Sequence, residues 1–158
     1  MKLTKITILI IVISSISSIS AQETSNKMNW EETIEFINKN KSEFKTAIFT
    51  SPDDFIFQLD KTDLKITYIT DGVYAITKCA ITKLDKVNNE GAQIFLDFNT
   101  EKCTRYEYKG TYKKGVEREP ANKLEVDFID FFLEKEDNSR SRKIIEAFKH
   151  LASLASKK

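Results

Sequence analysis

Hydrophobic and polar residues alternate most clearly between Leu64 and Leu84, which reads LKITYITDGVYAITKCAITKL. Asp71-Gly72 divides this stretch into two runs rich in β-branched and aromatic residues. Such a pair is typical of a type I′ hairpin, because both turn residues need a positive φ angle. The sequence therefore predicts a tight β-hairpin. Counting outward from its turn gives four opposite pairs: Thr70 with Val73, Tyr68 with Ala75, Ile66 with Thr77 and Leu64 with Cys79.

Side chains alternate between the two faces of a strand, so this hairpin has an apolar face and a mixed face. The apolar face carries Leu64, Ile66, Tyr68, Val73, Ala75, Cys79 and Ile81. The mixed face carries Lys65, Thr67, Lys78 and Thr82 among Ile69, Tyr74, Ile76 and Ala80. A single hairpin is marginally stable in water, so we expect more strands and a helix to cover the apolar face.

Two segments have the hydrophobic spacing of amphipathic helices. The first runs from Trp30 to about Lys45 and begins with a capping box, in which Asn29 is the N-cap and Glu32 lies three residues later. The second runs from Arg142 to Lys157, with Asn138 or Ser139 as its cap, and should close over the sheet. Its apolar stripe consists of Ile144, Ile145, Phe148, Leu151, Ala152 and Ala155.

The remaining apolar runs are short and read as further strands. We expect strands at Phe55–Leu59, Gln93–Phe98 and Cys103–Tyr112, a short addition at Val116–Glu119, and a last strand containing Leu124, Val126 and Phe128. Turns are expected at Ser51–Asp54, Asp60–Asp63, Asn88–Gly91 and Lys113–Gly115, and Phe131–Leu133 is expected to bury the crossover into the final helix. The predicted fold is α+β: an antiparallel sheet, or a partly open barrel, of six or seven strands flanked by two helices.

The first 21 residues have the pattern of a secretory signal peptide. Lys2 and Lys5 precede the apolar run Ile6–Ile13, which is too short to span a bilayer. We expect cleavage after Ala21, leaving a single domain over residues 22–158 with residues 22–28 flexible and no transmembrane span. The mature chain would then carry 23 basic and 24 acidic residues, so net charge gives no reason to expect nucleic acid or an anionic membrane as partner.

Cys79 and Cys103 are the only cysteines, and export would place them where disulfides persist. Alternation puts Cys79 on the apolar face of the hairpin. Cys103 falls on the face opposite Tyr106 and Tyr108, so it points outward if those tyrosines point inward. This difference in orientation argues against a disulfide between the two cysteines. A β-bulge would reverse the orientation of Cys103, so the sequence does not decide whether the disulfide forms.

Short strands ended by one amphipathic helix resemble pleckstrin-homology-like (PH/GRAM-like) domains. Trp30–Ile37 is similar to an "EET-x-x-W/F-I" helix, and Arg142–Leu151 to an "R-x-x-x-A-F-x-H-L" helix, of small exported Bacteroidetes proteins whose families have no assigned activity. The resemblance implies a fold and a location in the cell envelope. It implies no activity, because a fold does not determine a function. The first strand pair lacks the basic cluster with which PH-like domains bind phosphoinositides.

The sequence contains no recognisable catalytic motif and indicates no cofactor or metal site. His150 is the only histidine, and we expect it to make a hydrogen bond where the final helix meets the sheet. No serine or cysteine has the context of a nucleophile. The alternative function is a small hydrolase of the cell envelope that uses carboxylates brought together by the fold.

One stretch suggests a ligand site, because it interleaves cations with tyrosines that are able to stack on a sugar or a base. Its residues are Arg105, Tyr106, Tyr108, Lys109, Tyr112, Lys113, Lys114 and Arg118. The alternative is a purely structural role, in which this stretch is an edge hairpin whose tyrosines enter the core and whose lysines prevent pairing with another sheet. The sequence thus favours an exported, non-enzymatic binding module, periplasmic or extracellular, for a glycan, a lipid head group or a protein.

Overall fold

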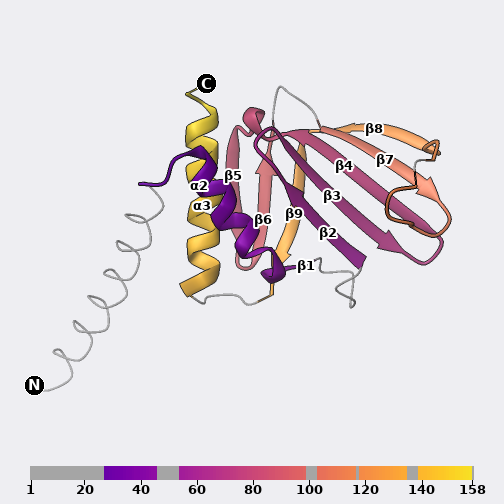
Figure 1. Cartoon of the computed structure of the whole chain (residues 1–158), viewed down its shortest axis with the longest axis horizontal. Coiled ribbons are helices and arrows are strands. Elements are labelled where there is room, and N and C mark those ends of the chain that lie inside the picture. Colours follow the sequence, from indigo (N-terminus) through magenta and orange to yellow (C-terminus); the bar gives the residue numbers. More distant parts are fainter. Residues whose placement is uncertain (1–26, 46–53, 99–102, 117, 135–138, 158) are drawn as a thin grey trace, which may run out of the picture.

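The structure is a computed structural model and describes residues 27–45, 54–98, 103–116, 118–134 and 139–157. Over these residues the chain forms two antiparallel sheets and two α-helices, which confirms the predicted α+β class (Figure 1). No closed barrel is formed by the described strands. The predicted signal peptide, Asn138 and most of the Ser51–Asp54 turn lie outside the described residues.

The larger sheet, sheet B, contains the predicted central hairpin. Its strand order is β2 (Phe55–Leu59), β3 (Asp63–Thr70), β4 (Val73–Ala80), β7 (Cys103–Lys109) and β8 (Asn122–Val126). All four predicted pairs of the hairpin are confirmed by the register of β3 and β4. Val73 shares the face of Ala75 and Cys79 as predicted, but it is not part of the core, because it lies at the tip of the hairpin and is 50% exposed.

The smaller sheet, sheet A, was not anticipated as a separate layer. Its order is β1 (Phe44–Lys45), β9 (Phe128–Leu133), β6 (Gln93–Asp97) and β5 (Lys86–Glu90). The described residues therefore form nine strands in two sheets, more than the six or seven predicted. Most of the expected loop Asn88–Gly91 belongs to β5, which pairs with β6 through a tight turn.

The predicted last strand is in fact two strands that belong to different sheets. At Asp127 the chain leaves β8 of sheet B and enters β9 of sheet A, and the Asp127 carbonyl accepts a hydrogen bond from the Phe98 amide at 2.8 Å. Leu124 and Phe128 are consequently 47% and 52% exposed. Phe131–Leu133 is the buried end of β9 rather than a crossover, and Val116–Glu119 adds no strand among its described residues.

Both predicted helices form, but the first ends early and the second begins early, at Ser139, which is therefore a helical residue rather than the cap. The predicted capping box is confirmed in α2 (Trp30–Lys39). The helix stops at Lys39 because the Asn40 side chain donates to the Phe36 carbonyl at 2.8 Å, and a 3₁₀ turn, η1 (Lys41–Glu43), leads into β1. The apolar stripe of α3 (Ser139–Ala155) is buried as predicted, against α2 and sheet A.

An aromatic cluster joins sheet A, sheet B and α3 into one core. Phe131 of β9 lies at its centre, with its ring centroid 5.7 Å from Phe57 of β2 and 5.6 Å from Phe148 of α3. Phe44 of β1 meets Phe57 edge to face at 4.7 Å. The distal half of sheet B, which carries the β3–β4 tip, extends beyond this core (Figure 1).

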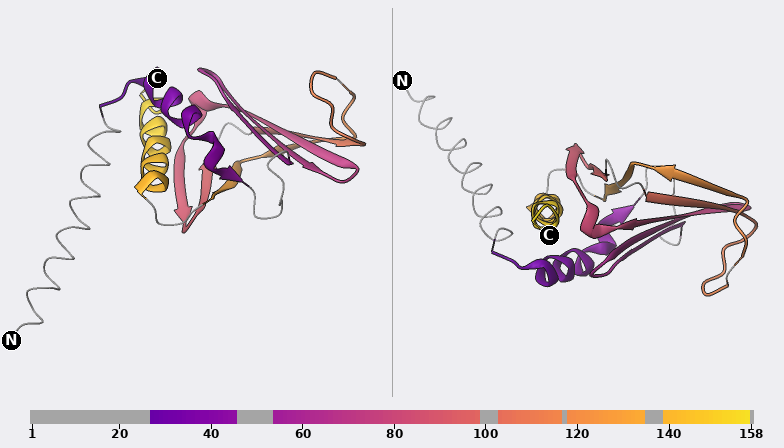
Figure 2. Two further views of the ribbon diagram at one scale, coloured as in Figure 1. Left: turned by 60° about the horizontal axis from the view of Figure 1, so that its bottom comes forward. Right: turned by 90° about the horizontal axis from the view of Figure 1, so that it is seen from above.

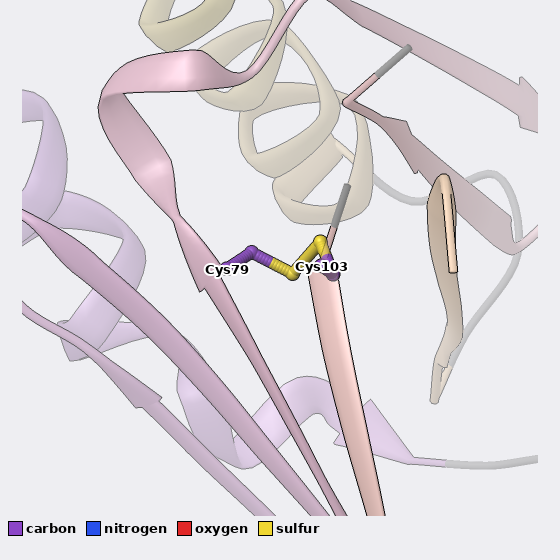
Figure 3. The surroundings of a disulfide bond; sticks show 2 residues. All are labelled: Cys79 and Cys103. Carbon is purple, nitrogen blue, oxygen red and sulfur yellow. A yellow bond between two sulfur atoms is a disulfide. The ribbon is translucent and has the colours of Figure 1, made fainter. Parts of the chain in front are cut away.

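A disulfide joins Cys79, near the end of β4, to Cys103, at the start of β7 (Figure 3). The 24-residue separation encloses the excursion through η3 (Ile81–Lys83), β5 and β6 into sheet A. Cys103 and the two tyrosines, Tyr106 and Tyr108, do lie on opposite faces of β7, but it is Cys103 that points into the core. The assumption that the tyrosines point inward was wrong, and the argument against a disulfide that depended on it was therefore wrong as well.

The disulfide should contribute about 3 kcal/mol to the free energy of unfolding, because it closes a loop of this length in the unfolded chain. The double variant Cys79→Ala/Cys103→Ala should therefore unfold at a lower denaturant midpoint than the oxidised protein. Reductant should lower the midpoint of the unmodified protein and leave that of the double variant unchanged. Equal midpoints for the oxidised and reduced protein would contradict the structural role.

Two phenylalanines of β9 provide a matched test of the core. Phe131→Ala should lower the free energy of unfolding by about 3–5 kcal/mol, since it leaves a cavity among four other rings. Phe128→Ala on the same strand should cost less than about 1 kcal/mol, because half of that side chain is already exposed. Chemical denaturation measures both, and similar losses would show that the core is not centred on Phe131.

Candidate functional site

The pairing of β4 with β7 gathers aromatic residues on the face of sheet B that points away from sheet A. We call this the outer face of sheet B. Its register places Tyr74 opposite Tyr108 and Ile76 opposite Tyr106, while Lys78 lies opposite Lys65 across the β3–β4 hairpin. The predicted mixed face of the central hairpin therefore becomes one side of a wider aromatic and basic surface.

The loop between β7 and β8 lies on the same side of sheet B, as Figure 2 shows. Two backbone hydrogen bonds of 2.7 Å fix its ends: the Gly110 amide donates to the Gly72 carbonyl, and the Ala121 amide donates to the Glu107 carbonyl. Gly110 has a φ of 96°, and a Cβ atom at this position would lie 2.9 Å from Nη1 of Arg118. The glycine therefore allows the guanidinium of Arg118 to pack against the backbone.

Between this loop and the sheet is a cleft of about 330 Å³, which we call the tyrosine cleft. Tyr74 and Tyr108 stack with their ring centroids 4.5 Å apart and their planes 6° from parallel. Tyr112 meets Tyr74 edge to face at 5.2 Å. Tyr74 is only 5% exposed, so the three rings form a fixed wall rather than three mobile side chains.

Cations surround this aromatic wall. Lys65, Lys78, Lys113 and Arg118 line the tyrosine cleft, and no carboxylate is among the described residues that line it. Beside it, Lys78 Nζ lies 5.5 Å from the centroid of the Tyr106 ring, and Lys123 Nζ lies 6.0 Å from the same centroid. The cleft thus combines flat apolar surfaces with a positive local field, an arrangement suited to an anion that carries a ring.

The structure divides the predicted patch between two faces of sheet B. It brings together Tyr108, Tyr112, Lys113 and Arg118 around the tyrosine cleft, with Tyr106 next to it. Lys114 is exposed and lines no cleft that we describe.

Arg105 and Lys109 lie on the opposite face, where they line a hollow of about 300 Å³ with Tyr68 and Glu107. Tyr74 and Tyr108 contribute to the lining of this hollow as well as to that of the tyrosine cleft. Arg105 Nε lies 3.3 Å from Glu107 Oε1, an ion pair without hydrogen-bond geometry. Tyr68 donates to the Asp130 carbonyl at 2.8 Å. Burial, together with the charge of Asp130, raises the pKa of Tyr68 far above its ordinary value, so this hydroxyl remains a donor.

Sequence reasoning missed the part of the cleft that the central hairpin supplies. Tyr74, Lys65 and Lys78 were assigned to the mixed face of that hairpin, yet they were not connected with Tyr108 or Arg118. The signal was present in the alternation of Tyr74, Ile76 and Lys78 on one face. The connection depends on the pairing of β4 with β7, which the chain itself does not reveal.

A third hollow, of about 650 Å³, lies where α2 and η1 meet β2 and β3, and we call it the helix cleft. Its two acids, Asp60 and Asp63, hold the predicted turn between these strands. Asp60 Oδ1 accepts hydrogen bonds of 2.8 Å from the amides of Thr62 and Asp63, and these bonds hold the pKa of the Asp60 carboxyl below its usual value.

His150 makes a structural contact rather than joining a reactive group. Its Nε2 lies 2.7 Å from the Met28 carbonyl, to which it donates in the tautomer that carries hydrogen on Nε2. The contact joins α3 to the segment before α2, whereas we expected it between α3 and the sheet. Across the described ranges, no three His, Cys, Asp or Glu side chains gather in a group able to hold a metal ion.

The two loop glycines allow the placement of Arg118 to be tested. Gly110→Ala and Gly115→Ala should each cost about 1–2 kcal/mol of stability, since both positions have a positive φ. Only Gly110→Ala should displace Arg118, because a Cβ at Gly115 meets nothing within 4 Å. The Arg Nε–Hε NMR signals report the displacement, and equal shifts in the two variants would contradict the contact.

Among the described helices, none combines the length and the apolar character needed to cross a membrane. Comparison of the chain with protein-family models, with curated proteins and with solved structures found no match. The geometry of the tyrosine cleft is therefore the basis for any functional assignment.

Proposed function

We propose that this protein is an exported, non-enzymatic binding module that holds an anionic glycan in the tyrosine cleft. The observation that carries this proposal is the lining of the cleft. Four cations and no described carboxylate surround a wall of three tyrosine rings that are held by contact with one another. A carboxylated or sulfated sugar offers both an anion for the cations and an apolar ring face for a tyrosine.

The chemistry of the cleft favours a glycan over the other two partners. A lipid head group requires cations that converge on one phosphate, whereas Lys65 and Lys113 belong to a strand and to a loop that lie on different sides of the cleft. A protein partner requires a broad surface with a desolvated centre. A hollow of about 330 Å³ is instead of the size that suits a small ring with its substituents.

Export is the second part of the proposal. The pattern of residues 1–21 supports a signal peptide with cleavage after Ala21, which would deliver the domain to the periplasm or the medium. The Cys79–Cys103 disulfide is compatible with such a compartment, because disulfides persist under oxidising conditions. The resemblance to small exported Bacteroidetes proteins supports the same address.

No observation favours the alternative of a carboxylate-dependent hydrolase. Such an enzyme needs two acids that face one cleft, one of them with a raised pKa so that it is protonated at neutral pH. Asp60 and Asp63 share the helix cleft, but the pKa of Asp60 is lowered, the wrong direction for a general acid. Both side chains accept hydrogen bonds within the turn that they stabilise.

Neighbouring lysines of the β7–β8 loop provide a matched test. Lys113→Glu should raise the dissociation constant for a heparin-derived disaccharide about tenfold, because a cation lining the cleft becomes an acid. Lys114→Glu makes the same change of net charge outside the cleft and should change affinity by less than about twofold. Isothermal titration calorimetry at a fixed salt concentration measures both constants.

The pair of variants separates the cleft from a general charge effect. Equal weakening by Lys113→Glu and Lys114→Glu would mean that the ligand responds to net charge, which would contradict binding in the tyrosine cleft. Selective binding of a phospholipid vesicle or of a protein, with no binding of charged sugars, would replace the glycan in the proposal.

A further inference from the structure

The tyrosine cleft and the helix cleft share two lining residues, Lys65 and Lys78. These lysines lie opposite each other on β3 and β4, on the outer face of sheet B. The two hollows therefore meet in one groove that runs along that face. Figure 2 shows α2 near one end of sheet B and the β7–β8 loop near the other, and residues of these two elements line the two hollows.

We infer that the ligand is a chain of linked acidic sugars that lies along this groove, with one end in the tyrosine cleft and the other end in the helix cleft. This inference rests on the proposed function and specifies its ligand as an acidic oligosaccharide rather than a single sugar.

The length of the groove supports a chain. Tyr74 and Lys78 are four residues apart on one strand, so the floor of the tyrosine cleft alone extends about 13 Å at ~3.3 Å per residue. The helix cleft continues from Lys78 toward Asn38 and Lys41, and its volume of about 650 Å³ is the larger of the two. A single ring would leave most of this continuous surface empty.

The two ends of the groove differ in chemistry. The tyrosine cleft is lined by aromatic rings, cations and the aliphatic residues Ile76 and Val116, whereas the helix cleft adds Asp60 and Asp63 to its lysines. Ionised carboxylates are acceptors for sugar hydroxyls, and the turn hydrogen bonds from Thr62 and Asp63 to Asp60 Oδ1 favour the ionised form of that carboxyl.

This asymmetry also separates the ligand from other anions. A polyphosphate carries ionised oxygens along its length but no hydroxyl that could donate a hydrogen bond to Asp60 or Asp63. An oligosaccharide places hydroxyls as well as anions along its length, so it matches a groove that is basic at one end and mixed at the other.

The test uses the full mature protein with oligogalacturonates and heparin-derived oligosaccharides, each as a disaccharide and as a hexasaccharide. The hexasaccharide of the preferred series should bind at least tenfold more tightly than the disaccharide. Lys41→Glu should weaken hexasaccharide binding about fivefold and leave disaccharide binding unchanged, because Lys41 lines only the helix cleft. Lys113→Glu should weaken both lengths about equally.

Lys39→Glu is the matched control for Lys41→Glu. Lys39 lies two residues away and pairs with Glu35 on an exposed surface, outside both clefts. It should alter neither affinity by more than about twofold.

The outcomes distinguish the two claims. Equal affinity for the two lengths, or an unchanged hexasaccharide affinity in Lys41→Glu, would overturn the extended groove and leave the proposed glycan site intact. Failure of both series to bind at either length would overturn the proposed function itself, and the extended groove with it.

Discussion

The pairing of β4 with β7 is the constraint on which the rest of the structure depends. It is non-local, because the chain leaves sheet B after Ala80, forms β5 and β6 in sheet A, and returns at Cys103. The register at that return decides two things at once. At the core end it places the two cysteines side by side, and at the distal end it places Tyr74 against Tyr108. The disulfide and the aromatic wall are thus two results of one alignment.

The division into a core half and a distal half explains where the clefts lie. Phe131 and its neighbouring rings occupy the space between sheet A, α3 and the proximal part of sheet B. The distal part of sheet B has no such layer against it, which is why Val73 and Leu124 are about half exposed. The inner face of this part is therefore open to solvent, whereas the β7–β8 loop lies over the outer face and forms the tyrosine cleft with it (Figure 2). A sheet that extends beyond its own core is a rigid platform for binding, since its strands remain fixed by hydrogen bonds to their neighbours.

Sequence patterns predicted those features that local interactions determine. The Asp71-Gly72 turn fixes the register of the hairpin within a few residues, and the capping box at Asn29 needs only Glu32. The change from sheet B to sheet A at Asp127 was not predictable, because hydrophobic and polar residues alternate without interruption through the residues on both sides of it. The orientation of Tyr106 and Tyr108 was misjudged for a related reason. Alternation shows which residues of a strand share a face, but it does not show which of the two faces meets the core. In β7 the face that carries the buried Cys103 meets the core, and the face that carries the tyrosines does not.

The alternation of side chains along β7 also connects the disulfide with the candidate site. Cys103 and Tyr108 lie on one strand but on opposite faces, so the bridge is buried in the core while the tyrosine faces the cleft. A one-residue slip of β7 against β4 would turn Tyr108 inward and Cys103 outward, and it would remove the stack with Tyr74. The covalent bond between the cysteines forbids that slip. A compartment that keeps the bond oxidised therefore also fixes the tyrosines in the orientation on which the cleft depends.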